Sequence, residues 1–177
     1  MTERELMDKI SSLEARIRMV EDIEEIKNLM AAYTVYLDSL QRMDELLALF
    51  TEDAKFSVSS SGDAGAEKAL MGTFEGKEAL RALFAQGAST AHYVYMAHHV
   101  TNPLIAVDGE KATGKWYLLS PFTALTPQGP RAVWEQGTYD NDYVKVDGKW
   151  KIKFMRFQFN FSTPYEDGWV KTRMRGA

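Results

Sequence analysis

The sequence contains no cysteine among its 177 residues. Disulfides, thiolate nucleophiles, and zinc or iron–sulfur sites with cysteine ligands are therefore excluded. No uncharged apolar run approaches the roughly 18 residues that a membrane-spanning helix requires. The charged segment MTERELMDKI stands where a secretory signal would carry its apolar stretch. We therefore expect a cytoplasmic chain without a membrane partner.

Positive charge is not in excess, because 21 Lys and Arg stand against 25 Asp and Glu and give a net charge of −4. This acidic balance argues against a nucleic-acid partner. Phosphate-binding loops are missing too, since Gly62 and Gly72 lack the Lys-Ser/Thr pair or the strand–helix context of such loops. The sequence thus predicts no nucleotide and no other cofactor.

Aromatic side chains, in contrast, are abundant: nine Phe, eight Tyr and four Trp. With 45% hydrophobic and 26% charged residues, the composition is typical of one soluble globular domain. The aromatic content fits either a large apolar cavity or a well-filled small core.

The amino-terminal segment has helical periodicity. Its apolar residues recur at alternating steps of four and three from Leu6 to Val20. This pattern predicts a helical arm over residues 1–21. We expect the arm to pack on its own domain or on a neighbouring subunit.

Asp22 followed by Glu25 resembles a capping box, and it predicts that a second helix begins there and runs over Ile23–Leu37. The apolar face of this helix has the period of a helix packed on a core. Two shorter helices are expected at Met43–Phe50 and 77–84.

From Ala91 onward the chain is rich in Val, Tyr, Phe, Trp and Thr, which predicts strands. With an earlier one at Lys55–Ser59, the expected strands are His92–Thr101, Leu104–Val107, Lys111–Ser120, Ala132–Val146 and Lys149–Phe161. Asp-Gly pairs at 108–109 and 147–148 indicate antiparallel hairpins, and 121–130 is expected to be a connection. Helices followed by a meander predict an α+β fold, with helices covering a curved antiparallel sheet. The domain is expected to span 22–165, with a tail at 166–177.

All three histidines lie within Ala91–Val100. Side chains alternate across a strand, so His98 and His99 point to opposite faces, and His92 lies about 20 Å from His98 along the strand. The three cannot share one metal ion, and we expect no metal. The inward histidine is a candidate general base, and Asp38 at the end of the long helix is a candidate to orient it. A core histidine and a solvated helix end are the alternatives.

Five segments in this order carry a resemblance to a known family: Ala31–Asp38 (AAYTVYLD), Leu46–Lys55 (LLALFTEDAK), His98–Ile105 (HHVTNPLI), Thr113–Leu118 (TGKWYL) and Asp147–Ile152 (DGKWKI). They are similar to the SnoaL-like branch of the NTF2-like superfamily, which includes scytalone dehydratase, bile-acid 7α-dehydratase and γ-hexachlorocyclohexane dehydrochlorinase. The resemblance implies a cone-shaped, cystatin-like barrel and commonly a homotrimer.

The resemblance also implies catalytic roles for three residues. His98 would be the base, Asp38 would orient it, and Tyr33, five residues before Asp38, would assist. Ser120 stands where the bile-acid dehydratase has an acidic residue, and Arg156 is one residue from the family's arginine position. The expected substrate-binding residues are Trp116, Tyr117, Ser120, Trp134, Arg156 and Phe159.

Together these features predict a cofactor-independent lyase of the dehydratase or elimination type. His98, oriented by Asp38, would remove a proton from a bulky aromatic or polycyclic hydroxylated molecule. One alternative is a carbon–carbon lyase that releases formaldehyde from a lignin-derived aromatic diol. Others are an isomerase or cyclase, and a non-catalytic ligand-binding or oxygenase-subunit-like scaffold.

Overall fold

The computed structural model describes the chain except residues 40, 62–68, 90–92 and 175–177. It begins with α1 (Glu3–Ser39), one continuous helix of 37 residues. The expected helix start at Asp22 is wrong, because nothing near it ends a helix and its carboxylate accepts hydrogen bonds from Lys145 and Trp150 of the sheet. The other helices are α2 (Met43–Ala48), α3 (Gly76–Ser89) and α4 (Gly168–Lys171).

The strands form one curved sheet in the order β2-β1-β7-β6-β5-β3, and β4 pairs with another length of β5. Their bounds are β1 (Phe50–Ser60), β2 (Ala69–Glu75), β3 (Tyr93–Met96), β4 (His99–Asp108), β5 (Lys111–Thr126), β6 (Gly129–Val146) and β7 (Lys149–Pro164). The described path ends at β2 and β3, so the sheet stays open. The α+β prediction is confirmed, except that β1 and β7 run parallel.

Three strand predictions are corrected. The expected connection at 121–130 is mostly strand, and β2 was not expected at all. The expected strand His92–Thr101 is divided between β3 and β4, and His92 itself lies outside the described residues. Pro121 is tolerated inside β5 because it lies where the neighbouring strand changes. Residues of β5 up to Leu119 pair with β4, and residues from Phe122 onward pair with β3. No described ladder bond on that side needs the N–H that proline lacks.

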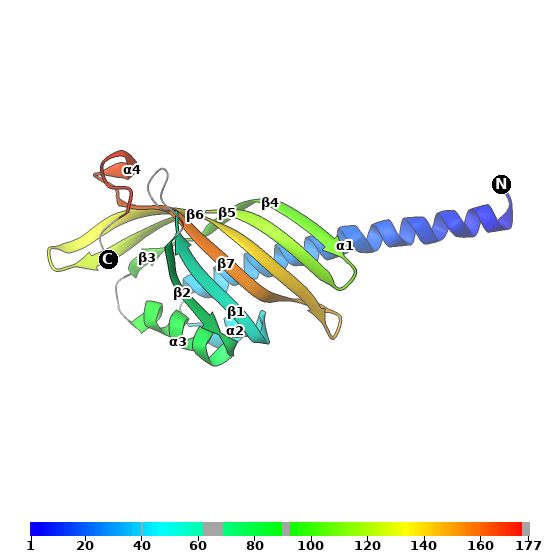
Figure 1. The fold of residues 1–177 in the computed structure, drawn as a ribbon, viewed down its shortest axis with the longest axis horizontal. Coiled ribbons are helices and arrows are strands. Elements are labelled where there is room, and N and C mark those ends of the chain that lie inside the picture. Colours follow the sequence, from blue (N-terminus) through cyan, green and yellow to red (C-terminus); the bar gives the residue numbers. More distant parts are fainter. Residues whose placement is uncertain (40, 62–68, 90–92, 175–177) are drawn as a thin grey trace.

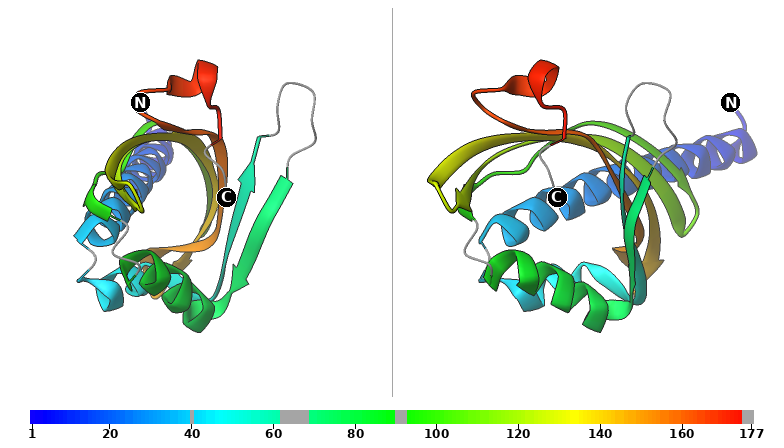
Figure 2. Two further views of the ribbon diagram at one scale, coloured as in Figure 1. Left: turned by 90° about the vertical axis from the view of Figure 1, so that its left-hand side faces the viewer. Right: turned by 60° about the vertical axis from the view of Figure 1, so that its left-hand side comes forward.

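The carboxyl-terminal half of α1 lies across the inner side of the curved sheet, and α2 and α3 cover its lower edge (Figures 1 and 2). Ile26, Met30 and Tyr33 of α1 are at most 1% exposed and pack in the main core. Full burial of such a side chain contributes about 1.5–3 kcal/mol. Burial on β5 alternates from Ala112 to Ala124, so even-numbered residues face the helices.

Gly137 allows β6 and β7 to approach closely where their pairing shifts register. A Cβ atom added there would lie 2.5 Å from the backbone oxygen of Gln158 and 2.5 Å from the Phe157 ring. The Phe157 ring can therefore lie against the strand and pack on the Tyr139 ring, with the ring centroids 4.8 Å apart and the planes tilted by 38°. The glycine thus shapes the aromatic wall described below.

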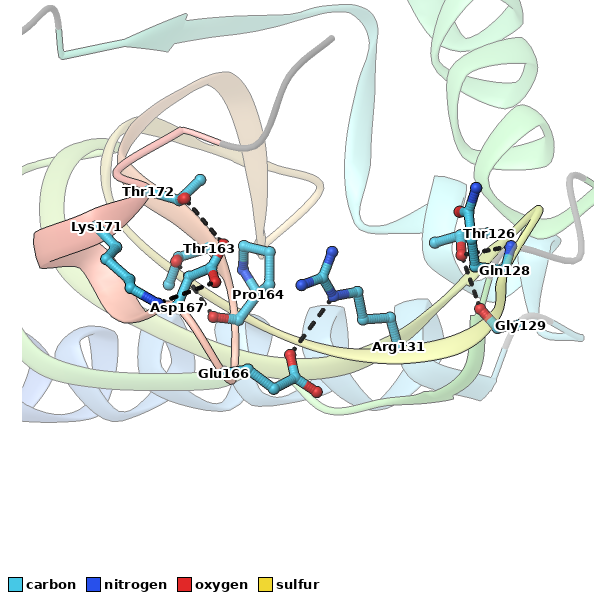
Figure 3. A network of polar contacts seen from close by, with 10 residues as sticks. All are labelled: Thr126, Gln128, Gly129, Arg131, Thr163, Pro164, Glu166, Asp167, Lys171 and Thr172. Atoms are coloured by element: carbon cyan, nitrogen blue, oxygen red, sulfur yellow. Dashed lines mark hydrogen bonds and ion pairs between the residues drawn. The ribbon is translucent and has the colours of Figure 1, made fainter.

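The carboxyl-terminal segment is held against the sheet by polar contacts (Figure 3). Arg131 of β6 pairs with Glu166 at 3.4 Å, and Thr172 donates to Asp167 at 2.9 Å. Arg173 donates to the backbone oxygen of Asn160 at 3.0 Å. Within the described ranges, none of the helices has the length and apolar character that crossing a membrane would take.

Candidate active site

A cavity of about 230 Å³ lies between the sheet and helices α1 and α3. Its polar groups are the side chains of Tyr33, His98, Ser120, Glu135 and Tyr139. Apolar side chains form the rest of the wall: Leu37, Phe56, Val58, Leu83, Phe84, Met96, Leu118, Phe122, Phe157 and Phe159. A few polar groups on an aromatic wall are typical of a site for an apolar small molecule.

His98 and Asp38, separated by 60 residues in sequence, are in direct contact. Nδ1 of His98 lies 2.5 Å from Oδ1 of Asp38, and the backbone N–H of His98 donates to Oδ2 at 3.0 Å. The side chains are 12% and 26% exposed. A carboxylate at Nδ1 fixes the tautomer that carries hydrogen there, so the lone pair of the neutral ring is on Nε2.

Local structure brings the two residues together. Asp38 lies in the last turn of α1, where the helix dipole carries partial negative charge. His98 lies in a two-residue break between β3 and β4, and there the N–H of Ala97 donates to Pro121 at 3.2 Å. His99 begins β4 and is exposed. The break, not strand alternation, therefore directs His98 to Asp38.

Tyr33 and Tyr139 form a tyrosine pair on the cavity wall. Their rings meet edge to face with centroids 6.1 Å apart. Burial raises the pKa of both phenols well above the ordinary value of 10.0, and the nearby Asp38 charge adds to the rise. Hydrogen bonding between the hydroxyls lowers the pKa of Tyr33 in part. Both groups stay protonated at neutral pH and can donate hydrogen bonds.

Ser120 and Glu135 are direct partners across β5 and β6, and both line the cavity. Ser120 is 1% exposed, and Glu135 accepts a 2.9 Å hydrogen bond from Ser162. Sequence reasoning identified Ser120 but missed Glu135. The hairpin register could have identified Glu135. Thr126 pairs with Gly129 at the turn, and counting six residues away from the turn on each strand pairs residue 120 with residue 135.

Among the other expected substrate-binding residues, Phe159 lines the cavity. Trp116 lies in the core, where its indole donates to the Tyr143 hydroxyl at 2.9 Å. Trp134 is half-buried, opposite Pro121 on β5. Neither tryptophan is among the described residues that line the cavity.

Tyr117 and Arg156 are not brought together with His98. Tyr117 is 54% exposed and lies on the face of β5 away from the helices. Arg156 pairs with Asp142 at 2.6 Å. Both line a second, outer hollow of about 580 Å³. The guanidinium of Arg156 is thus engaged in an ion pair outside the cavity that contains His98.

In the part of the chain that the structure describes, no group of three or more His, Cys, Asp or Glu residues is arranged to hold a metal ion. The candidate site therefore consists of one histidine–aspartate pair, two buried phenols and one hydroxyl–carboxylate pair.

Comparisons with known proteins bear on the family and the fold of the chain. Residues 18–156 match the model of a family described as SnoaL-like domain. No curated protein matches the chain significantly. A candidate scytalone dehydratase of Novosphingobium aromaticivorans is 26% identical with a TM-score of 0.65, over 82% of this chain and 89% of that protein.

Two further solved structures share the fold. The hexachlorocyclohexane dehydrochlorinase LinA type 2 has a TM-score of 0.70 at 21% identity, over 84% of this chain and 92% of that one. An NTF2-like protein of Novosphingobium aromaticivorans, described as having a cystatin-like fold, has a TM-score of 0.60 at 24% identity. That match covers 86% of this chain and 91% of the other. The NTF2-like, cystatin-like fold is therefore confirmed.

Proposed function

The chain belongs to the SnoaL-like domain family, and from this membership we propose that it is a lyase that eliminates water from a hydroxylated aromatic molecule. The observation that carries the proposal is His98 on the wall of an apolar cavity, with the carboxylate of Asp38 in contact with its Nδ1 atom. The similarity to a candidate scytalone dehydratase supports the reaction class. The proposed step requires only groups that the chain itself supplies.

In the proposed reaction, Nε2 of His98 removes a proton from a carbon next to the one that bears the hydroxyl. The C–H electron pair forms the double bond, and the C–O bond breaks. The proton is returned to the departing oxygen, so the products are the unsaturated compound and one water. A positioned general base contributes about 10²- to 10⁴-fold in rate. Asp38 and the end of α1 stabilise the positive charge that His98 gains.

The departing oxygen needs a hydrogen-bond donor, and the tyrosine pair supplies one. Because their pKa values are raised by burial, Tyr33 and Tyr139 remain neutral over the working pH range, and since Tyr139 donates to the Tyr33 hydroxyl, the O–H of Tyr33 is available to the substrate. Glu135 and Ser120 supply an acceptor and a hydroxyl on the same wall. Glu135, the partner of Ser120 on the neighbouring strand, thus offers an acidic group next to the position where the bile-acid dehydratase carries one.

The cavity volume favours a small substrate. An apolar cavity of about 150 Å³ holds one benzene, and this one measures about 230 Å³. We therefore propose a substituted single ring or a compact two-ring compound, rather than the polycyclic substrates that the sequence also allowed.

The test is a mass-spectrometric screen of hydroxylated one- and two-ring aromatics, performed in D₂O with the wild type, His98→Ala and Asp38→Asn. His99→Ala is the matched control, because it removes the adjacent but exposed imidazole. We expect loss of one water with the wild type and with His99→Ala. Turnover should fall about 10²-fold or more in His98→Ala.

Each other result has a defined meaning. Loss of formaldehyde in place of water would replace the proposal with a carbon–carbon lyase. Deuterium uptake at constant composition, dependent on His98, would indicate an isomerase. Equal turnover of His98→Ala and the wild type would refute the mechanism. Binding without any conversion across the panel would favour the scaffold alternative.

Three expectations from the sequence stay predictions. Homotrimeric assembly is tested by light scattering of the purified chain. Independence from cofactors is tested by activity after exhaustive dialysis against chelator. Cytoplasmic localisation is tested by cell fractionation.

A further inference from the structure

The amino-terminal arm, residues 1–21, is exposed along its whole length. Figure 1 shows it projecting past the sheet as the free end of α1. Its apolar residues are exposed too: Ile10 by 40%, Leu13 by 53%, Ile17 by 56% and Val20 by 60%. Packing of the arm on its own domain, one of the two expectations above, is therefore wrong.

A helix whose apolar stripe is exposed to solvent gains stability when another surface packs on that stripe. Isolated helices of about 12–15 residues are marginal in water, and most helices in proteins are stabilised by packing of one face. The arm has the face but no described partner within its own chain. Its helix is already nucleated, because residues from Ile26 onward are packed on the sheet. Even a short interface along the stripe would therefore add stability.

The stripe has the geometry of a coiled-coil seam. Ile10 and Ile17 occupy a positions, and Leu6, Leu13 and Val20 occupy d positions. A shallow depression along the arm is lined by Leu13, Arg16, Ile17, Val20 and Glu21. The first four are successive d, g, a and d residues, which together form a hole for one apolar knob of a facing helix.

The flanking charges select the orientation of that facing helix. Lys9 and Arg16 occupy g positions, and Glu14 and Glu21 occupy e positions five residues later. In a parallel coiled coil each g residue meets the e residue of the next heptad, so Lys9 faces the partner's Glu14 and Arg16 faces the partner's Glu21. In an antiparallel pair, g meets g and e meets e, which opposes like charges.

From this stripe and these charges we propose that the arm forms a parallel, in-register coiled coil with the arm of a second copy of this chain. A membrane surface is a poorer occupant, because residues 1–21 hold four basic and five acidic side chains. Interfacial helices that bind anionic lipid are rich in Lys and Arg. Parallel arms require a rotation axis along the coil, which generates a closed cyclic assembly.

Cysteine cross-linking tests the proposal directly, because the natural chain has no thiol. Leu6→Cys and Val20→Cys each introduce one cysteine at a d position near one end of the arm. Ala15→Cys is the matched control, because position 15 is an f position on the outer side of the coil. Two cysteines can join only when their Cα atoms lie within about 7 Å. In a parallel pair, residue 6 meets residue 6 and residue 20 meets residue 20.

Under mild oxidation we expect L6C and V20C each to shift from the monomer to the dimer band on a non-reducing gel, while A15C stays at the monomer. If L6C and V20C stay at the monomer as well, the proposal is overturned. In an antiparallel pair a d position meets an a position, so a linked band that forms only when L6C and Ile17→Cys are refolded together would show that the arms are antiparallel and would overturn the proposal too. Circular dichroism of each variant verifies the fold.

Charge exchange gives an independent readout. Arg16→Glu opposes two acidic groups in the parallel pair, and the double variant Arg16→Glu/Glu21→Arg restores the attraction. We expect light scattering to detect weaker association in the single variant and recovery in the double variant. Tighter association of the single variant would contradict the parallel arrangement, because in an antiparallel pair it would relieve repulsion.

Discussion

Asp22 is expected to contribute strongly to stability, at the point where the arm joins the domain. Its carboxylate accepts hydrogen bonds from Lys145 and, at 2.8 Å, from the indole of Trp150. The side chains of Asp22 and Lys145 are only 14% and 24% exposed, and Trp150 is 4% exposed. Replacing Asp22 by Ala therefore leaves a buried indole N–H and a half-buried ammonium without their acceptor.

The magnitude follows from these contacts. Hydrogen bonds to charged groups contribute about 1.5–3 kcal/mol, and an unsatisfied buried donor costs about 1–3 kcal/mol. We expect Asp22→Ala to lower the free energy of unfolding by about 2–4 kcal/mol. Asp22→Asn keeps one acceptor oxygen but removes the charge, and it should cost about 1–2 kcal/mol. Glu24→Gln is the control, because its ion pair with Lys27 is exposed and contributes about 0–1 kcal/mol.

The effect should depend on pH with a defined sign. Burial alone would raise the pKa of Asp22, but the hydrogen bonds from Lys145 and Trp150, with the Lys145 charge, outweigh it and hold the pKa below the ordinary 3.8. A carboxyl with a lowered pKa stabilises the fold above the unfolded-state value and loses this contribution as the pH falls through the folded-state value. The advantage of the wild type over Asp22→Asn should therefore be full at pH 7 and shrink below about pH 4.

Urea denaturation at fixed protein concentration, at pH 7 and then at decreasing pH, measures both effects. Fixed concentration matters because assembly contributes to apparent stability. An Asp22→Ala variant as stable as Glu24→Gln would refute the reasoning. So would a wild-type advantage over Asp22→Asn that stays constant down to pH 3.

Two further predictions concern Gly137 and the buried tyrosines. Gly137→Ala should lower the free energy of unfolding by about 1–3 kcal/mol, because the added methyl group collides with the backbone of β7 and the Phe157 ring; a thermal melt within error of the wild type would contradict this. Because burial raises the pKa of three phenols, stability should be full below about pH 10 and fall above it, as the unfolded state ionises first. The three phenols are those of Tyr33, Tyr139 and Tyr143. An absorbance titration should show that they ionise only when the protein unfolds. Ionisation of all tyrosines before unfolding would contradict the prediction.

The meander of the fold could be read from the sequence because its signals are local. The Asp-Gly pairs at 108–109 and 147–148 lie at the β4–β5 and β6–β7 turns. Asp147 and Gly148 both have positive φ, at 50° and 73°, as a tight hairpin turn requires. The strand predicted over Lys111–Ser120 likewise lies within β5.

Other features depend on contacts between distant segments, and local patterns missed them. The β1–β7 pairing joins Phe56 to Met155, and short-range periodicity carries no sign of it. Asp22 looked like a helix cap because the pattern could not reveal its partners Lys145 and Trp150. At the site, family resemblance selected His98 and Asp38, which are in contact. Glu135 was missed because its position depends on register, which residue spacing within one strand does not report.

The parallel pairing of β1 with β7 has a consequence for the order in which the chain folds. Strands β4 to β7 are joined by short turns and contact their sequence neighbours, whereas β1 must wait for a strand about 100 residues later. Closing a long loop is entropically costly and slows the contacts that depend on it. The hairpins are therefore expected to form first, with α1 and β1 docking onto them at the end. Asp38, Tyr33 and Phe56 all come from this late-docking part, so the cavity acquires its shape only in the last step of folding.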